Sequence, residues 1–202
     1  MPQKTKNTPM MEQYLSIKKQ YPDAFLFYRL GDFYELFHDD AMKAAKSLEI
    51  TLTSRNKNAD EPIPMCGVPY HAAAEYIRRL VEMGHKVAVC EQMEDAKLTK
   101  GMVRREVVRV ITPGTFLNEN GSENKANNYL ASVFRNEAGG YALGYVDIGT
   151  GELKVTLLTN EDGVFNELQT LPFKEIVLDA KTAEVLTEKL EKQFGILVSI
   201  QE

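Results

Sequence analysis

The spacing of hydrophobic residues changes several times along this chain, and these changes predict its secondary structure. Hydrophobic residues three or four positions apart predict helices, whereas alternation and short continuous apolar runs predict strands. In the first part of the chain, helices are expected at about residues 9–21, 39–48 and 70–83. Thr8 and Pro9 are typical of an N-cap and first helical residue, and Asp39 is the expected cap of the second helix.

Short runs rich in aromatic and β-branched residues predict strands in the same part of the chain. These runs are residues 25–29, 33–37, 50–53, 86–92 and 106–111. The first two are expected to pair through a turn at Gly31 and Asp32. Residues 62–69 contain three prolines, which donate no backbone hydrogen bond, so this run is expected to be a rigid loop and not a regular strand.

A polar segment over residues 118–128 predicts a linker, and the pattern changes beyond it. Three strands are followed by alternating helices and strands: strands at 129–135, 141–147, 153–158, 175–178 and 196–200, and helices at 164–171 and 183–194. This order predicts an α/β sheet of the ribonuclease H type. The expected fold class is therefore α/β with two small domains, a mixed-sheet domain over residues 1–117 and a ribonuclease H-like domain over residues 129–202.

The charge distribution supports two domains with different partners. The 202-residue chain has a net charge of −5, but residues 1–118 hold 17 Lys and Arg against 15 Asp and Glu, whereas residues 119–202 hold 7 against 14. The sequence has no apolar run of about 18 residues and no hydrophobic signal core at its start. We therefore expect a cytoplasmic protein with reduced cysteines and no membrane partner.

Phe33 and Glu35 form the most informative pattern for function. Side chains alternate along a strand, so these two are expected on the same face. An ordinary buried hairpin explains the surrounding aromatics by composition, but a buried carboxylate needs a partner. An apolar wedge beside a hydrogen-bonding group instead suits insertion into a DNA base step.

Basic residues near the strand over 106–111 are candidates for phosphate contacts, although a solvated surface loop explains them as well. They are Lys97, Lys100, Arg104 and Arg105. Arg55, in a polar loop, is a further candidate.

Two other chemistries remain open at this point. Cys66, His71, His85 and Cys90 invite a zinc hypothesis, although their spacing is wider than structural zinc sites favour. A ribonuclease H-like nuclease would need clustered carboxylates to hold Mg²⁺, and the acids available in the second domain are Asp147, Glu175 and Asp179.

The glycines after Asp147 are typical of a phosphate-binding hairpin or of a plain turn. The sequence has no Walker A motif, so this chain is not expected to hydrolyse ATP.

Several blocks of the sequence resemble the N-terminal part of the bacterial MutS family of DNA mismatch recognition proteins. The resemblance lies in residues 8–11, 26–37, 50–53, 61–65, 67–71, 90–92 and 109–115. Beyond residue 128 the chain resembles the MutS connector domain, chiefly through pattern and through residues 145–148.

The resemblance implies a function and a set of site residues. In the family the Phe-x-Glu pair, here Phe33 and Glu35, enters the minor groove, where phenylalanine stacks on a mispaired or unpaired base and glutamate hydrogen-bonds to it. Leu30 and Asp32 flank the pair and are expected in the same groove. We expect nearby DNA phosphates to raise the pKa of Glu35.

The resemblance also implies partners. The partners are duplex DNA with mismatches or small loops, a MutL-type protein at the connector domain, and a second MutS subunit in the full-length protein. The resemblance also implies that ATP and Mg²⁺ bind the full-length parent. This chain itself is expected to hold no cofactor. The chain is expected to be a nucleoid-associated N-terminal fragment or a truncated homologue, not itself an enzyme. Two alternatives remain: an adaptor that binds proteins through its aromatic hairpin, and the nuclease described above.

Overall fold

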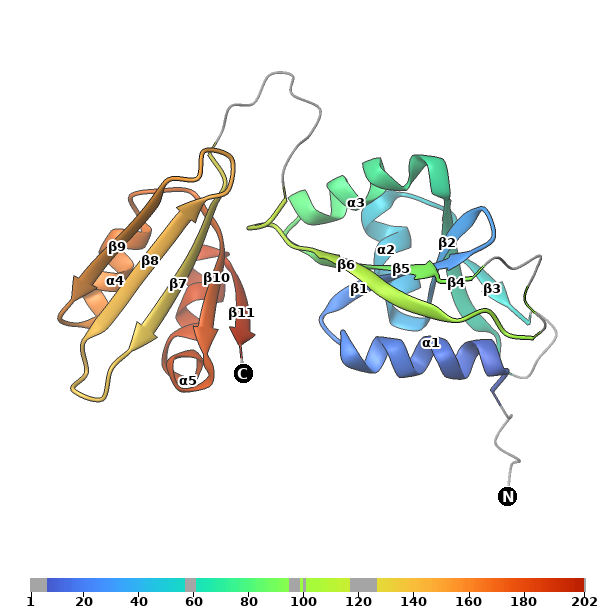
Figure 1. The fold of residues 1–202 in the computed structure, drawn as a ribbon, viewed down its shortest axis with the longest axis horizontal. Helices are drawn as coiled ribbons and strands as arrows, with labels where there is room; N and C mark the ends of the chain where they lie inside the picture. The colour runs from blue at the N-terminus through green and yellow to red at the C-terminus, as the bar shows by residue number, and fades with distance from the viewer. Residues whose placement is uncertain (1–6, 57–60, 95–98, 100, 117–126, 202) are drawn as a thin grey trace. The chain divides into compact units, whose positions relative to one another are not determined.

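The computed structural model describes residues 7–56, 61–94, 99, 101–116 and 127–201, so Lys97 and Lys100 lie outside the described residues. It contains two compact units, Met1–Ile111 and Thr112–Glu202, each built around its own sheet (Figure 1). Both sheets are mixed and both are covered by helices, which confirms the expected α/β fold class. None of the described helices is long and apolar enough to cross a bilayer.

The first unit is a mixed sheet with α1 on one face and α2 and α3 on the other (Figure 1). The strand order is β3-β4-β2-β1-β5-β6; β1 and β5 pair in parallel, and the other described neighbours pair antiparallel. The strands are β1 (Ala24–Leu30), β2 (Phe33–Phe37), β3 (Thr53–Arg55), β4 (Ile63–Pro69), β5 (Lys86–Gln92) and β6 (Arg105–Ile111). The helices are α1 (Pro9–Gln20), α2 (His38–Leu48) and α3 (Ala73–Glu82), the last preceded by a 3-10 turn, η1 (Tyr70–Ala72).

Local sequence explains where the first helix begins, but the expected cap of the second was wrong. Thr8 caps α1, and its hydroxyl accepts a hydrogen bond from the backbone N–H of Met11 at 3.4 Å. Helix α2 begins one residue before Asp39 and has no side-chain cap, because the chain passes directly from the buried end of β2 into the helix. The neighbouring Asp40 is buried, where it accepts a hydrogen bond from the backbone N–H of Leu26 at 3.0 Å.

The expectation of a loop over residues 62–69 was wrong, because β4 is a central strand that pairs with both β2 and β3. The ladder with β2 runs from Met65 to Pro69, so its only proline is the terminal residue. Pro64 lies beyond that ladder, opposite the short edge strand β3. Prolines are tolerated here because they lie where β4 is paired on one side only or ends.

The second unit is a five-stranded sheet in the order β11-β10-β7-β8-β9, with β7, β10 and β11 parallel and β8 and β9 antiparallel to their neighbours. Its strands are β7 (Tyr129–Arg135), β8 (Tyr141–Asp147), β9 (Leu153–Leu158), β10 (Phe173–Asp179) and β11 (Leu197–Gln201). Its helices are α4 (Glu161–Leu168) and α5 (Ala180–Lys189), and α5 continues as a π-helical turn, η2 (Leu190–Phe194). The predicted order of three strands followed by alternating helices and strands is confirmed.

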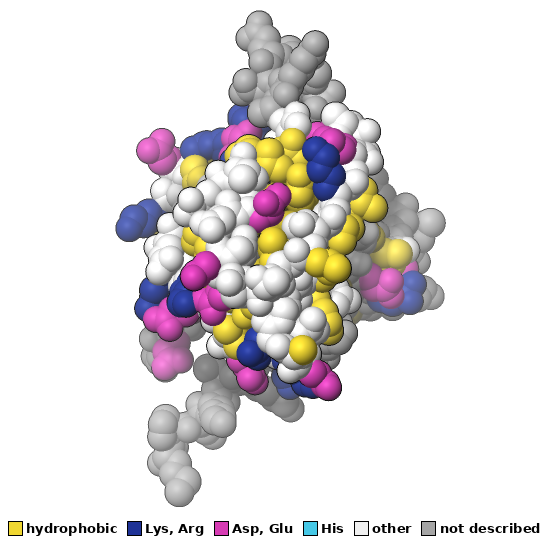
Figure 2. Space-filling model, turned by 90° about the vertical axis from the view of Figure 1, so that its left-hand side faces the viewer, with side chains coloured by type: hydrophobic (Ala, Val, Ile, Leu, Met, Phe, Trp, Pro, Cys, Tyr) yellow, Lys and Arg dark blue, Asp and Glu magenta, His cyan; other side chains and the backbone are white. Residues whose placement is uncertain are grey.

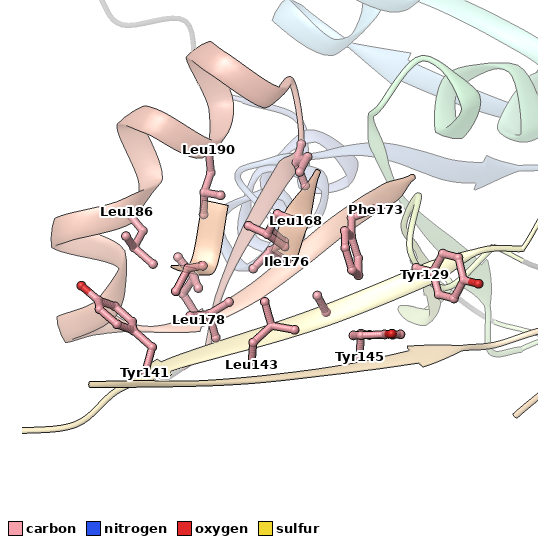
Figure 3. Packing of buried hydrophobic residues seen from close by; sticks show 14 of the residues in the cluster. Tyr129, Tyr141, Leu143, Tyr145, Leu168, Phe173, Ile176, Leu178, Leu186 and Leu190 are labelled. Atoms are coloured by element: carbon pink, nitrogen blue, oxygen red, sulfur yellow. The ribbon is translucent and has the colours of Figure 1, made fainter. Parts of the chain in front are cut away.

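The core of the second unit fills the space between one face of its sheet and the helices (Figure 3). Tyr129, Tyr145 and Phe173 form a group of mutually contacting rings, with centroids 5.4–5.9 Å apart. Figure 2 shows that hydrophobic side chains reach the surface among charged ones. On β9, the side chains that alternate away from this core are exposed. Those of Leu153, Val155 and Leu157 are 69–81% exposed.

The segment just before the expected linker packs with the second sheet, and the two compact units divide at Thr112; the expected end of the first domain at residue 117 stays a prediction. The amide of Asn128 donates hydrogen bonds to the carbonyls of Pro113, Gly114 and Phe116 at 2.9–3.2 Å. The backbone N–H of Gly114 donates to the buried carboxylate of Glu175 at 3.1 Å. These contacts place residues 112–116 with the second sheet.

Candidate nucleic-acid interface

The side chains of Phe33, Glu35 and Phe37 share one face of β2 because strand side chains alternate. Helix α1 covers only one end of this row, where the ring of Tyr14 lies 4.9 Å from that of Phe37. Phe37 is fully buried, Glu35 is partly buried, and Phe33 is 47% exposed. The strand therefore presents an unburied aromatic ring beside a carboxylate.

The turn before Phe33 is fixed to neighbouring elements. Gly31 has a φ of +58°, a value that favours glycine, and its N–H donates to Oε1 of Gln92 at 3.1 Å. The carbonyl of Asp32 accepts a hydrogen bond from the N–H of Tyr70 at 2.8 Å, while the Asp32 side chain is exposed. Leu30, half-buried, pairs directly with Phe33 across the hairpin. These contacts hold the exposed ring at the end of a well-ordered strand pair.

Glu35 has an unusual environment for a carboxylate. Its Oε2 atom is buried and accepts no hydrogen bond from any described residue, although Nη1 of Arg55 lies 3.6 Å away. That distance is an ion-pair contact but is too long for a hydrogen bond. Burial raises the pKa of Glu35, and the nearby charge of Arg55 opposes this rise. The rise was expected from DNA phosphates, whereas here burial within the protein causes it.

Gly67 contributes to this surface and was not singled out from the sequence. It pairs with Glu35 across β2 and β4, and a Cβ atom placed on it would lie 3.6 Å from Cγ of Glu35 and 3.9 Å from Cδ1 of Phe33. The absence of a side chain therefore leaves the flank of both residues open. A glycine within a strand often marks the close approach of a ligand or another backbone, and this pattern can point to Gly67 from sequence. The prediction of a loop over residues 62–69 hides it, because the pattern has this meaning only within a strand.

The candidate phosphate contacts separate into different environments. Arg104 has a 62% exposed side chain and pairs with Glu106 at 3.1 Å. Arg105 is only 9% exposed, and its guanidinium donates to the carbonyls of Arg29 at 2.7 Å and Val103 at 2.9 Å. The expectation for Arg105 was therefore wrong, because its donors are used inside the protein. Arg55 is 38% exposed and adjoins Glu35.

The zinc hypothesis finds no support in the geometry. No three His, Cys, Asp or Glu side chains gather into a metal-binding group within the described ranges. Cys66 and Cys90 are buried on β4 and β5, and burial raises the pKa of their thiols to about 11 and about 12, respectively, which disfavours the thiolate that binds zinc.

Two of the three candidate acids of the second unit, Asp147 and Glu175, are also occupied by structural contacts. Asp147 accepts hydrogen bonds from the N–H of Gly149 at 2.9 Å and the hydroxyl of Thr150 at 3.0 Å, so it stabilises the turn between β8 and β9. Although burial raises the pKa of Asp147, these hydrogen bonds hold it below its ordinary value. Glu175 is bound by Gly114 and Ser199. The described residues thus lack the carboxylate cluster that a ribonuclease H-like nuclease requires.

The fold and this surface define a two-domain α/β protein with an exposed aromatic ring beside a partly buried carboxylate on its first domain. Comparison with known proteins places it more narrowly: the family model of MutS domain I matches residues 8–120, and that of MutS domain II matches residues 128–200. The chain therefore belongs to the MutS family.

Curated relatives agree with this assignment. The DNA mismatch repair protein MutS of Geobacillus sp. (strain WCH70) is 53% identical over 96% of this chain, and that of Listeria monocytogenes serotype 4a (strain HCC23) is 53% identical over 98%. In both cases the match covers 23% of the relative. The protein of Geobacillus thermodenitrificans (strain NG80-2) is also 53% identical, over 96% of this chain and 21% of the relative. The chain thus spans less than a quarter of the length of these proteins.

Proposed function

We propose that this chain provides the mismatch-binding element of a DNA mismatch repair protein. The observation that supports the proposal most directly is that the exposed Phe33 shares one face of β2 with Glu35, whose buried Oε2 accepts no hydrogen bond from any described residue. Buried carboxylate oxygens are normally hydrogen-bonded, so an unsatisfied one beside an exposed ring is consistent with a partner that arrives from outside.

In this proposal Phe33 inserts at a mispaired or unpaired base from the minor groove, and Glu35 hydrogen-bonds to that base. An apolar wedge unstacks a base step and kinks the duplex. A mispaired or unpaired base costs less to unstack than a paired one, so the same wedge gains more net free energy there. Leu30 and Asp32 would line the same groove, and the half-exposed or exposed Arg55 and Arg104 would contact phosphates.

We also propose, from membership of the family, how this chain fits into a longer protein. The second unit would act as the connector and bind a MutL-type partner, which agrees with the acidic balance of residues 119–202. Subunit association and the binding of ATP and Mg²⁺ would belong to regions of the relatives that this chain does not match, so this chain itself would not be an enzyme. A cytoplasmic location at the nucleoid follows from the proposed DNA partner.

The proposal is tested by titrating the chain at low salt against a matched duplex and the same duplex with one unpaired thymine. We expect tighter binding to the unpaired thymine and loss of this preference in Phe33→Ala. Phe134→Ala is the matched control, because Phe134 is a similarly exposed phenylalanine (54%) on the second unit. It should bind both duplexes as the unmodified chain does.

Two outcomes would contradict the proposal. Equal binding of both duplexes by the unmodified chain and by Phe33→Ala would show that Phe33 does not recognise the unpaired base. Failure to bind any duplex at low salt would instead favour an adaptor that uses the aromatic hairpin to contact protein.

A further inference from the structure

Arg55 stands between Glu35 and an open cavity. It ends the edge strand β3, where it pairs with Ile63 of β4, and its guanidinium lies 6.0 Å from the centre of the Phe37 ring. The same side chain lines a cavity of about 280 Å³ together with Thr8 and His38. Arg55 thus reaches across β4 toward the carboxylate of Glu35 while its other side borders free space.

Glu35 has few other groups to hold it. Its neighbour on β4 is Gly67, which has no side chain, and its neighbour on β1 is Tyr28. The hydroxyl of Tyr28 donates to Gln13 of α1 and does not bond to Glu35. Other titratable or charged groups packed on this face include Tyr14 of α1, which contacts Phe37 and His38, and Cys90 of β5, which packs with Tyr28. Arg105 of β6 also lies on this face, with its guanidinium 5.0 Å from the centre of the Tyr28 ring. Among the described residues, Arg55 is the cation in ion-pair contact with Glu35.

We propose that Arg55 is a positioning residue for Glu35, which holds its carboxylate beside Phe33 in the ionised form and thereby sets which base edges it can hydrogen-bond to. An ionised carboxylate only accepts hydrogen bonds, whereas a protonated one can also donate. Arg55 favours the ionised form by its charge, and burial favours the protonated form. The balance between these two effects decides whether Glu35 meets a base as an acceptor or as a donor.

This inference rests on the proposed function for its consequence in DNA binding, but its physical basis can be measured without DNA. The carboxyl carbon signal of Glu35 in NMR gives its titration midpoint directly. We expect Arg55→Gln to raise the pKa of Glu35 above that of the unmodified chain, because the opposing charge is removed. Arg55→Lys should return the midpoint most of the way to that of the unmodified chain, and Arg104→Gln, which removes a cation paired with Glu106, should leave the midpoint unchanged.

An unchanged or lowered Glu35 midpoint in Arg55→Gln would overturn the inference, whatever the chain does with DNA. Recovery of the midpoint in Arg55→Lys shows that the positive charge at position 55 is the cause, and an unchanged amide spectrum away from position 55 in Arg55→Gln shows that its fold is intact.

The DNA experiment then tests the link to recognition. Arg55→Gln and Arg104→Gln should each weaken binding to all duplexes by roughly two- to fivefold, as expected for the loss of one exposed charge. The preference for the unpaired thymine should change with pH as Glu35 titrates. Of the two variants, only Arg55→Gln should shift this pH, and it should shift it upward, as it does the Glu35 midpoint. If the midpoint moves and the preference does not follow it, the inference is overturned. If the unmodified chain shows no preference at all, the proposed function fails, and the NMR comparison still decides whether Arg55 controls Glu35.

Discussion

Glu35 and Gly67 lie directly opposite each other on neighbouring antiparallel strands, and the glycine leaves one flank of the carboxylate uncovered. A Cβ atom at position 67 would make ordinary contacts, 3.4 Å from the carbonyl oxygen of Tyr34 and 3.6 Å from Cγ of Glu35. The backbone of β4 thus has room for a small side chain. A larger one would project beside Phe33 and Glu35, where the proposed base enters.

We therefore expect substitutions at Gly67 to separate folding from recognition. Gly67→Ala should leave the free energy of unfolding within about 0.5 kcal/mol of the unmodified chain, because its Cβ meets no atom closer than 3.4 Å. Gly67→Leu should weaken binding to the duplex with an unpaired thymine by about tenfold, because its side chain occupies the open flank of the pair. Denaturant unfolding and duplex titration measure the two effects. Unweakened binding by a folded Gly67→Leu would show that the base does not approach from this flank.

Arg105 and Arg104 are adjacent in sequence, yet we expect their substitutions to change the free energy of unfolding by very different amounts. Arg105→Gln leaves the carbonyls of Arg29 and Val103 without their buried donor, so the free energy of unfolding should fall by about 2–4 kcal/mol. Arg104→Gln removes an exposed ion pair with Glu106 and should change it by less than about 1 kcal/mol. Thermal or urea unfolding of the two variants in parallel measures this difference, and equal stabilities would contradict the structural role of Arg105.

The pair of arginines shows where prediction from sequence reached its limit. Residue type and loop placement made both candidates for phosphate contacts, but burial of Arg105 depends on α1 and β1, which are distant in sequence. Similarly, the prolines of residues 62–69 excluded a central strand only on the assumption that both edges of the run are paired throughout. The tertiary arrangement, in which Pro64 faces only β3 and Pro69 ends the ladder, removed that obstacle.

Local patterns were sufficient elsewhere. The Thr8-Pro9 cap, the hairpin at Gly31 and the strands of the second unit follow from residue spacing and turn chemistry within a few positions of each element. The common face of Phe33 and Glu35 followed from strand alternation alone. The ion-pair partner of Glu35 could not be predicted in this way, because Arg55 reaches Glu35 across β4, a strand that the sequence did not predict.

The raised pKa of Glu35 predicts a specific pH dependence of stability. Because the folded chain binds this proton more tightly than the unfolded chain, the contribution of Glu35 to stability is present below the ordinary value of 4.5 and is lost as pH rises through the raised pKa. Glu35→Gln should therefore match the unmodified chain most closely below about pH 4 and be more stable than it at pH 7.

Denaturant unfolding at both pH values measures this difference. Glu106→Gln, on an exposed position of β6, controls for the change in net charge and for the loss of an ion pair, because Glu106 pairs with Arg104 as Glu35 pairs with Arg55. A stability difference between Glu35→Gln and the unmodified chain that does not grow with pH, after subtraction of the control, would contradict the expected cost of ionising Glu35.

The contacts of Asn128 predict where the second unit begins. A chain of residues 112–202 retains the carbonyls of Pro113, Gly114 and Phe116 that accept hydrogen bonds from Asn128, and the N–H of Gly114 that binds the carboxylate of Glu175. A chain of residues 118–202, which begins at the linker expected from sequence, lacks all four. Among the described residues, it leaves Ser199 as the hydrogen-bond partner of the buried Glu175. We therefore expect the longer chain to be more stable by about 2–4 kcal/mol, because buried polar groups that lose their partners are costly.

Urea unfolding of the two chains, followed by the fluorescence of the core tyrosines, measures the difference. Gly114→Ala in the longer chain is an internal test, because a Cβ atom there would lie only 2.8 Å from Cβ of Glu175 and from Cδ1 of Leu130. Its crowding should remove part of the same stabilisation. Equal stability of the 112–202 and 118–202 chains would show that residues 112–116 do not belong to the cooperative unit of the second sheet.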